Sequence, residues 1–223
     1  MPEDFQRPEL KMIREAGYDW EDPRDAVTIF EDKIAEYAGS KYAVAVDSCT
    51  DALFLCLRYY IERVFPGEIS SVVIPERTYI SVPMTVINAG LKVKFEHVEW
   101  SGCYQLNNLD IFDGAARFTE GMYEGGLHCL SFQIKKRLPI GKGGMVLTDD
   151  EAAVRWLRLA SFEGRDLSVS QWDVNPDVIG WNMYMTPEDA ARGILLFDQL
   201  PNKNDDTGCY INYPDMSKLE IFK

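Results

Sequence analysis

The sequence predicts an α/β protein in which helices flank a mostly parallel sheet. Two observations support this fold class. Apolar strand-like runs of four to seven residues alternate with amphipathic helical segments, and the 223 residues suffice for one large domain. Hydrophobic residues make up 46% of the chain and aromatic residues 12%, which excludes a disordered protein. No apolar run approaches the ~18 residues of a membrane span.

The first half of the chain is expected to hold three helices and three strands. Asp22 suits the N-cap and Pro23 the first position of a helix that Gly39 ends. The second helix is apolar over much of its circumference and should lie against the sheet. The expected elements are helices from Asp22 to Gly39, Asp51 to Val64 and Ile80 to Asn88, and strands from Tyr42 to Val46, Ser71 to Ile74 and Lys92 to Val98.

The second half is expected to continue the alternation. Asp149, Asp150 and Glu151 open a helix with acidic residues suited to the helix dipole. Another helix should begin at Thr186-Pro187-Glu188 and run to Leu200. Strands are expected at Leu109 to Phe112, Cys129 to Phe132 and Met145 to Thr148. From Pro201 the chain is rich in Asn, Asp and Lys, and a loop or frayed end is expected.

Charge and cysteine usage narrow the possible partners and compartments. The formal net charge is −13, so the overall field repels nucleic acid and anionic membranes, and an anionic ligand needs a local pocket. The five cysteines are odd in number and include no CxxC pair, and the segment MPEDFQRPEL is charged rather than apolar. We therefore expect a cytoplasmic protein with reduced thiols. With two histidines and no HExxH pattern, no metal site is expected.

The first candidate site is the segment Ser48-Cys49-Thr50-Asp51, between a strand and a helix. Free backbone N–H groups and the positive end of the helix dipole converge there, and the hydroxyls of Ser48 and Thr50 add donors for a phosphate. The alternative interpretation is an ordinary Ser/Thr N-cap, which the segment by itself favours.

The second candidate is Asp113, which ends the apolar strand LDIF and precedes small residues. A carboxylate at the carboxyl end of a buried strand is suited to pairing with a cationic ring nitrogen. It would serve equally well as a helix N-cap, and the residues alone do not separate these alternatives.

The third candidate is the stretch SFQIKKRLPIGKGGM, from Ser131 to Met145. A strand end is followed by a basic turn with Lys135 and Lys136, and three glycines then allow a tight return into the next strand. A partly desolvated lysine close to other cations would have a lowered pKa and could form a Schiff base. The alternative is a solvated basic loop, the usual outcome for adjacent lysines.

Five segments in order resemble the DegT/DnrJ/EryC1/StrS family of sugar aminotransferases across residues 26 to 200. They are SCTDALFLCL, VVIPERTYISVPMTVINAGLKVKFEHVE, IFDGAARFTEGMYEGG, LSFQIKKRLPIGKGGMVLTDDE and GWNMYMTPEDAARGILLFDQL. Each motif is weak singly, whereas five in order with matching spacing are a strong signal. The resemblance implies the large domain of a pyridoxal 5'-phosphate (PLP)-dependent transferase of fold type I, like that of aspartate aminotransferase, over residues 1–200. Residues 201–223 would be a tail in place of the family's small C-terminal domain.

The resemblance also implies roles for individual residues. Lys136, five residues after Ser131, would form the Schiff base with PLP and later move protons, with Lys135 and Lys142 as rivals that do not fit the spacing. Asp113 would keep the pyridine nitrogen protonated. The backbone at Cys49 and Thr50, with Ser48 and Ser131, would bind the cofactor phosphate. Tyr79 would stack on the ring or be an ordinary sheet-facing aromatic. Asn182 would reach the neighbouring subunit's phosphate or be a turn residue.

Several positions depart from the family pattern. Ala116 stands where the family has Gln or His, Cys49 replaces a glycine, Lys142 replaces the glutamate of GEGG, and Tyr184 replaces an arginine. Between Glu99 and Leu109 the family carries an additional strand and helix, and this chain has only a short segment.

The function implied is transfer of an amino group, from glutamate, to a nucleotide-linked keto-sugar by a homodimer with shared active sites. The departures and the missing segments favour an alternative, a reduced homologue that binds PLP or a partner subunit without turnover. A third hypothesis, a nucleotide-binding α/β domain, has little support because neither GxGxxG nor GxxxxGKS/T occurs in the chain.

Overall fold

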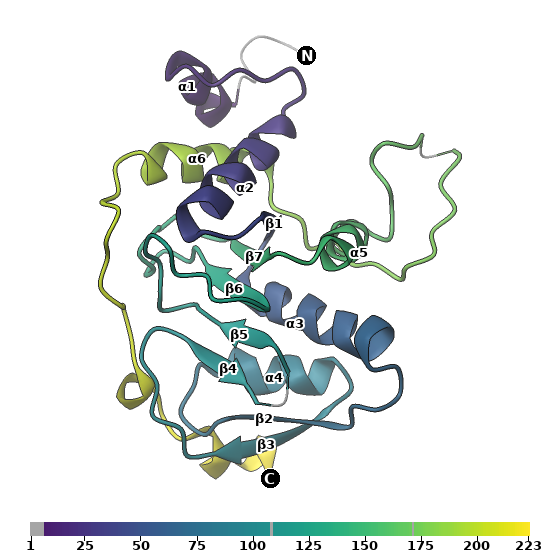
Figure 1. The fold of residues 1–223 in the computed structure, drawn as a ribbon, viewed down its shortest axis with the longest axis vertical. Helices are drawn as coiled ribbons and strands as arrows, with labels where there is room; N and C mark the ends of the chain where they lie inside the picture. The colour runs from purple at the N-terminus through teal and green to yellow at the C-terminus, as the bar shows by residue number, and fades with distance from the viewer. Residues whose placement is uncertain (1–6, 108, 171) are drawn as a thin grey trace.

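The computed structural model describes residues 7–107, 109–170 and 172–223 of the chain. The segment MPEDFQ, on which the expectation of no apolar leader partly rests, lies outside the described residues. A five-stranded sheet with the strand order β1-β7-β6-β5-β4 forms the centre of the molecule (Figure 1). Its strands are β1 (Tyr42–Val46), β4 (Tyr104–Leu106), β5 (Ile111–Asp113), β6 (Leu127–Ser131) and β7 (Gly144–Thr148), and a separate parallel pair is formed by β2 (Ser71–Pro75) and β3 (Lys92–Glu96).

The prediction of a mostly parallel main sheet is wrong. Strand β7 lies antiparallel to both β1 and β6, and β4 lies antiparallel to β5, so that β5 and β6 form the one parallel pair among the described strands of this sheet. The connections explain the difference. A parallel neighbour needs a crossover, usually a helix, whereas β4 joins β5 through residues 107–110 and β6 joins β7 through a loop without a helix.

The helices cover both faces of this sheet, as the α/β prediction requires. They are α1 (Pro8–Glu15), α2 (Asp25–Ala38), α3 (Cys49–Tyr59), α4 (Ser81–Asn88), α5 (Glu151–Ser161) and α6 (Pro187–Phe197), and a π-helical turn (Tyr60–Val64) prolongs α3. Helix α1 was not expected. Asp22 is not the N-cap of α2, which begins only at Asp25; the Asp22 carboxylate accepts the N–H of Arg24 at 2.8 Å, one residue before the helix.

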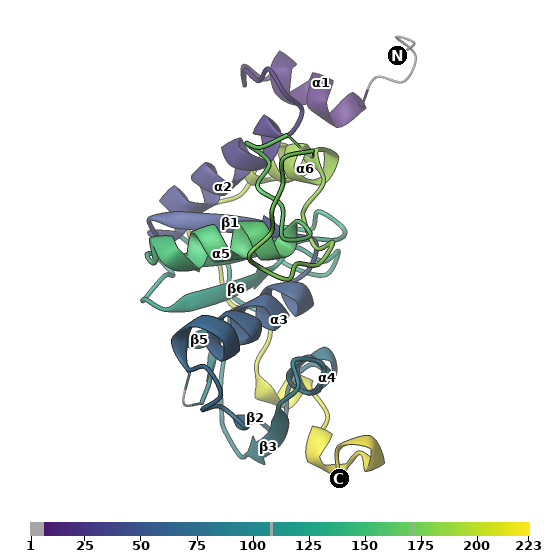
Figure 2. The same cartoon turned by 90° about the vertical axis from the view of Figure 1, so that its right-hand side faces the viewer.

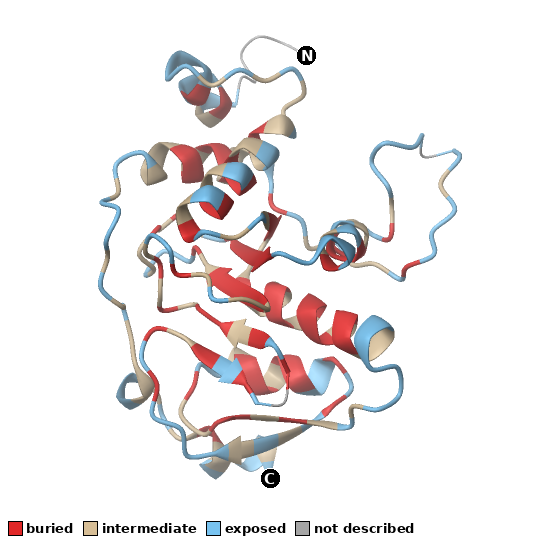
Figure 3. Ribbon diagram, viewed as in Figure 1, coloured by how far each residue is buried: buried red, intermediate tan, exposed pale blue. Residues whose placement is uncertain are grey.

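Alternating residues of the central strands supply two separate cores. Val44 and Val46 of β1 pack with α3 and α5, whereas Ala43 and Ala45 pack with α1, α2 and α6. Because successive side chains of a strand point to opposite faces, a fully apolar strand such as YAVAV fits between two helical layers. Figure 2 shows α3 and α5 on one side of the strands, and Figure 3 shows the buried residues concentrated in the sheet and in α3.

The segment after Leu200, named here the C-terminal segment (201–223), is a loop with three short 3₁₀ turns rather than a frayed end. It runs from α6 past the ends of the main-sheet strands to β2 and β3 (Figure 1). Backbone bonds join Gly102 N–H to Gly208 O at 2.9 Å and Tyr210 N–H to Trp100 O at 3.0 Å. The turns are Tyr210–Asn212, Met216–Lys218 and Glu220–Phe222. Composition alone left a loop and a frayed end as alternatives because it does not register these tertiary bonds.

Among the described residues, no helix combines the length and the apolar character needed to cross a membrane. All five cysteines lie in the described part of the chain, and each is a free thiol.

Candidate active site

Helix α3 begins at the edge of a cavity. Ser48 is its N-cap, and the Ser48 hydroxyl accepts the N–H of Asp51 at 3.1 Å, so the capping interpretation of this segment is correct. Ser48, Cys49 and Thr50 also line the cavity, and the positive end of the helix dipole therefore faces it. Capping and anion binding are compatible here because the cap uses one N–H of the first turn.

Two glycines of the SFQIKKRLPIGKGGM stretch bring the backbone of β7 against the start of α3. A Cβ atom on Gly144 would lie 2.3 Å from the carbonyl carbon of Ser48 and 2.4 Å from the amide nitrogen of Cys49. Gly143 has a φ of 146°, a conformation that side chains rarely adopt, and it forms a bridge with Ser48. The glycines thus fix the position of the loop at the helix N-terminus.

Asp113 is the last residue of β5 and lies buried at the inner wall of the cavity. Its Oδ1 accepts the N–H of Ala115 at 2.9 Å, and its Oδ2 accepts the hydroxyl of Tyr104 at 2.7 Å. Burial raises the pKa of Asp113, while the two hydrogen bonds and the charge of Lys136 act in the opposite direction. The carboxylate is therefore dry, oriented and close to a cation.

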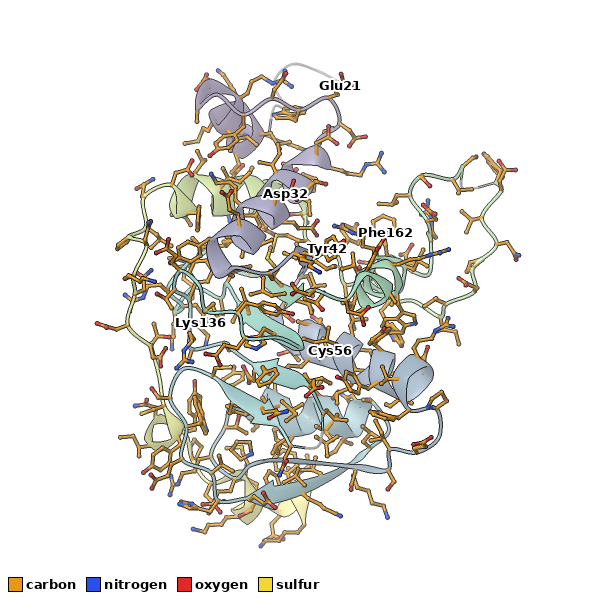
Figure 4. The ribbon with its side chains drawn as sticks, viewed as in Figure 1. Glu21, Asp32, Tyr42, Cys56, Lys136 and Phe162 are labelled. Atoms are coloured by element: carbon orange, nitrogen blue, oxygen red, sulfur yellow. The ribbon has the colours of Figure 1, made fainter. Side chains whose placement is uncertain are left out.

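Three lysines reach the cavity from the loop between β6 and β7. The backbone N–H of Lys136 bonds to Gln133 O at 2.8 Å, and that of Lys135 bonds to the Gln133 side chain at 2.8 Å, so one glutamine closes the turn that presents both. Lys142 pairs with Asp47 at 2.6 Å. Among these lysines, the charge of Lys136 opposes the rise that burial causes in the pKa of Asp113. Lys136 lies on the side of the sheet along which the C-terminal segment passes (Figure 4).

An aromatic wall completes the cavity. The Trp100 ring lies 4.8 Å from that of Tyr104 and 5.5 Å from that of Tyr213, a residue of the C-terminal segment. Tyr79 also lines the cavity and is 60% exposed, so it is not a residue packed into the sheet.

The structure thus brings seven of the eight predicted site residues to one cavity of about 540 Å³, within the usual range for small-molecule sites. These residues are Ser48, Cys49, Thr50, Tyr79, Asp113, Ser131 and Lys136. The eighth, Asn182, is absent from this cavity. Its side chain donates to Glu163 Oε1 at 2.9 Å, beyond the end of α5.

The departures from the family pattern are accommodated in different ways. The thiol of Cys49 is buried and lies 3.6 Å from Cys129 O and 4.0 Å from Asp113 Oδ1. Ala116 is a buried residue that lines the cavity. The ring of Tyr184 stacks on that of Phe162 at 4.5 Å.

Sequence reasoning missed Thr78, Trp100, Tyr104 and Tyr213, all of which line the cavity. Thr78 and Tyr104 bear on Asp113, since the Thr78 hydroxyl is hydrogen-bonded to the Tyr104 hydroxyl, which in turn donates to the carboxylate. The position of Thr78 beside Tyr79 was a usable signal. Nothing in the sequence indicated Tyr213, because it reaches the site through tertiary contacts of the C-terminal segment.

A larger cavity of about 1020 Å³ lies between α2, α5 and the loop that follows α5. None of the predicted site residues lines it. The buried Glu31 carboxylate accepts the N–H of Ala45 at 2.7 Å and pairs with Arg158 at 2.7 Å, so its charge is compensated within the chain.

The chain is similar in sequence to members of one known protein family. Residues 7–109 and 121–206 match the model of the DegT/DnrJ/EryC1/StrS aminotransferase family. The spore coat polysaccharide biosynthesis protein SpsC of Bacillus subtilis is 28% identical over 83% of this chain and 59% of its own length. The GDP-perosamine synthase of Caulobacter vibrioides is 25% identical over 77% of this chain and 56% of its own length. The chain therefore spans less than two thirds of the curated relatives that it matches.

Solved structures show the same fold. PseC of Helicobacter pylori, an aminotransferase involved in the biosynthesis of pseudoaminic acid, superposes with a TM-score of 0.69 at 15% identity, covering 86% of this chain and 62% of its own. The match to the family model covers most of the chain and includes Lys136, whereas Asp113 lies between the two matched ranges. The chain belongs to the DegT/DnrJ/EryC1/StrS aminotransferase family.

Proposed function

We propose that the chain is a PLP-dependent aminotransferase that moves an amino group, from glutamate as donor, to a nucleotide-linked keto-sugar. The observation that carries the proposal is the meeting of the Lys136 amine, the buried Asp113 carboxylate and the N-terminus of α3 at one cavity. The names of the relatives in Bacillus subtilis and Caulobacter vibrioides support a sugar acceptor.

The residues present fit PLP. An aldehyde needs an amine, a pyridinium nitrogen needs a desolvated carboxylate, and a phosphate needs N–H donors and a positive dipole. The cavity supplies Lys136 for the first, Asp113 for the second and the start of α3, with Thr50 and Ser131, for the third. The close approach of Gly144 to the Ser48–Cys49 backbone supports this assignment, because it holds the start of α3 in place at the cavity.

Bound PLP supplies an electron sink for the pair left when a substrate Cα–H bond breaks. In this proposal the Lys136 amine would hold PLP through its aldehyde and, when free of that bond, would take up the proton removed from the substrate carbon. Asp113 keeps the ring nitrogen protonated, since a buried anion stabilises a cation beside it. Tyr79 covers the face of the ring, and the α3 N-terminus fixes the phosphate so that the ring does not swing during proton transfer.

The C-terminal segment contributes to this site in the proposal. Thr207, Asn212 and Tyr213 line the cavity, and Arg117 fixes the segment through two hydrogen bonds to Asp206, both 2.9 Å long. We therefore propose a PLP-binding domain over residues 1–200, with residues 201–223 forming one wall of its cavity.

Two further proposals concern assembly and location. Asn182 lies away from its own chain's cavity, beside Glu163, which supports a homodimer in which this amide serves the neighbouring subunit's site. Five unpaired thiols support a reducing compartment, the cytoplasm.

The visible spectrum of the purified chain with added PLP tests the proposal. We expect a yellow, borohydride-trappable species that Lys136→Ala abolishes. Lys135→Ala and Lys142→Ala are matched controls, because both lysines line the same cavity, and both variants should remain yellow. A colourless wild-type chain would overturn the assignment of PLP.

The alternative is a homologue that binds PLP without turnover, favoured by Ala116 at the position of a family Gln or His. Adding glutamate separates the two functions. Loss of the yellow band and release of 2-oxoglutarate indicate a transaminase. A band that is unchanged across a panel of amino donors indicates the non-catalytic homologue.

A further inference from the structure

Asp113 is held by a hydrogen-bonded chain of two side chains, Tyr104 from the short segment in which this protein differs from its family and Thr78 from the stretch between β2 and α4. The Tyr104 hydroxyl donates to Asp113 Oδ2 at 2.7 Å, and the Thr78 hydroxyl is hydrogen-bonded to the Tyr104 hydroxyl. Tyr104 has one proton and directs it to the carboxylate, so Thr78 is the donor to Tyr104. All three residues are buried.

The backbone register fixes Tyr104 in this position. Strands β4 and β5 are antiparallel, and Tyr104 is the direct partner of Asp113. The Tyr104 ring packs against Trp100, with the ring centres 4.8 Å apart. Directly opposed side chains of an antiparallel pair lie on the same face of the sheet, so the contact follows from the fold and not from a surface rotamer.

The charge of Asp113 depends on the groups that face it. Burial raises its pKa, and the Tyr104 bond, the Ala115 N–H and the charge of Lys136 oppose this effect. The groups around it are Cys49 of α3, Cys103 and Tyr104 at β4, Lys136 of the β6–β7 loop and Tyr213 of the C-terminal segment. Of these, Tyr104 is the side chain that makes a short hydrogen bond to the carboxylate.

We propose that Tyr104 is a positioning residue whose hydroxyl keeps Asp113 ionised and oriented, so that the carboxylate can accept the pyridinium N–H of PLP. A carboxylate has about four acceptor positions, and the bonds from Ala115 and Tyr104 leave room for another donor. The inference rests on the proposed function and adds a residue that the family motifs do not contain. The hydrogen bond from the Thr78 hydroxyl helps to hold the Tyr104 hydroxyl in place.

Tyr104→Phe is the decisive variant, because it removes one oxygen and keeps the ring that packs on Trp100. Tyr59→Phe is the matched control, since the Tyr59 hydroxyl donates to Asp150 Oδ2 at 3.1 Å, away from the cavity. The loss of a hydrogen bond to a charged group predicts a rise of about tenfold to a hundredfold in the PLP dissociation constant for Tyr104→Phe. The control should change it less than about twofold.

Unfolding of the cofactor-free chain gives a second readout. The folded-state pKa of Asp113 lies above its unfolded value, so its contribution to stability falls as pH rises from the unfolded pKa through the folded one. Tyr104→Phe removes an interaction that lowers the folded pKa. The difference in urea midpoint between wild type and Tyr104→Phe should therefore be larger at pH 8 than at pH 4. The difference between wild type and Tyr59→Phe should not change with the ionisation of Asp113.

The outcomes distinguish this inference from the proposed function. Weaker PLP binding together with a pH-dependent midpoint difference supports the role of Tyr104. A midpoint difference that is constant across pH, or PLP binding equal to that of Tyr59→Phe, overturns it. If wild type binds no PLP, the proposed function fails and the cofactor role of Tyr104 fails with it, while the pH series still tests whether Tyr104 keeps Asp113 ionised.

Discussion

Gly144→Ala tests whether the glycine pair builds the phosphate cradle. The added Cβ would lie 2.3 Å from the Ser48 carbonyl carbon and 2.4 Å from the Cys49 nitrogen, both backbone atoms. Since real Cβ contacts are longer than 3.0 Å, the strand and the helix start must separate by at least about 0.7 Å, the difference between 3.0 and 2.3 Å. No side-chain rotation can relieve this contact.

Two effects should follow from that displacement. Overpacking of this kind costs about 1–3 kcal/mol of unfolding free energy. A shift of the helix N-terminus also moves its N–H groups relative to the phosphate, so we expect PLP affinity to fall by at least about tenfold. Gly144 is not in the left-handed region, so the change reports the contact and not backbone strain.

Urea unfolding of the cofactor-free chain and fluorescence titration with PLP measure the two effects. Gly208→Ala is the control, because its added Cβ would meet Ala116 at an ordinary 3.6 Å. We expect that variant to unfold within about 0.5 kcal/mol of wild type. A Gly144→Ala chain that is as stable as wild type and binds PLP equally well would refute the cradle.

Three other changes address stability and the C-terminal segment. His128 is buried, with neither ring nitrogen bonded to another described residue, and burial lowers its pKa to about 4. On acidification the unfolded state therefore takes up the proton first, and the free energy of unfolding should fall by about 2–3 kcal/mol between pH 6.5 and 4. His128→Phe should remove that acid dependence in urea midpoints measured across this range, and an unchanged slope would contradict it. Glu31→Ala should lower the free energy of unfolding by about 2–4 kcal/mol, because it leaves the Ala45 N–H and Arg158 without their acceptor. Glu31→Gln should lower it less in the same unfolding assay. Equal losses would show that these hydrogen bonds are unimportant. Asp206→Ala should lower stability by at most about 1 kcal/mol but speed trypsin cleavage after Lys203, because its pair with Arg117 holds the C-terminal segment, and an unaltered cleavage rate would show that other contacts suffice.

The local elements followed from local sequence. The apolar run YAVAV, the Thr186-Pro187 start of α6 and the acidic start of α5 at Asp149–Glu151 were all predicted, because helix-start signals and periodicity act within a few residues. The five ordered motifs also led to the family and to seven residues that the structure gathers at one cavity.

The direction of the strands and the aromatic wall of the cavity could not be predicted from the local sequence. Strand β7 runs antiparallel to β1 and β6, which depends on how a loop without a helix turns back. Tyr104 and Tyr213 reach the cavity through pairing with β5 and through backbone bonds between the C-terminal segment and residues 100–102.

The sequence by itself determined most of the helices and strands, though not α1 or β4, together with the apolar faces and the identity of the lysine and aspartate candidates. Helix caps, hydrophobic periods and residue spacings signal these features, and all three depend on residues that lie close together in the chain. Only the tertiary structure decided which way the strands run, that the C-terminal segment folds back over the cavity, and that Tyr104 holds Asp113. These features depend on contacts between residues far apart in sequence, whose free energy arises only when the sheet has assembled.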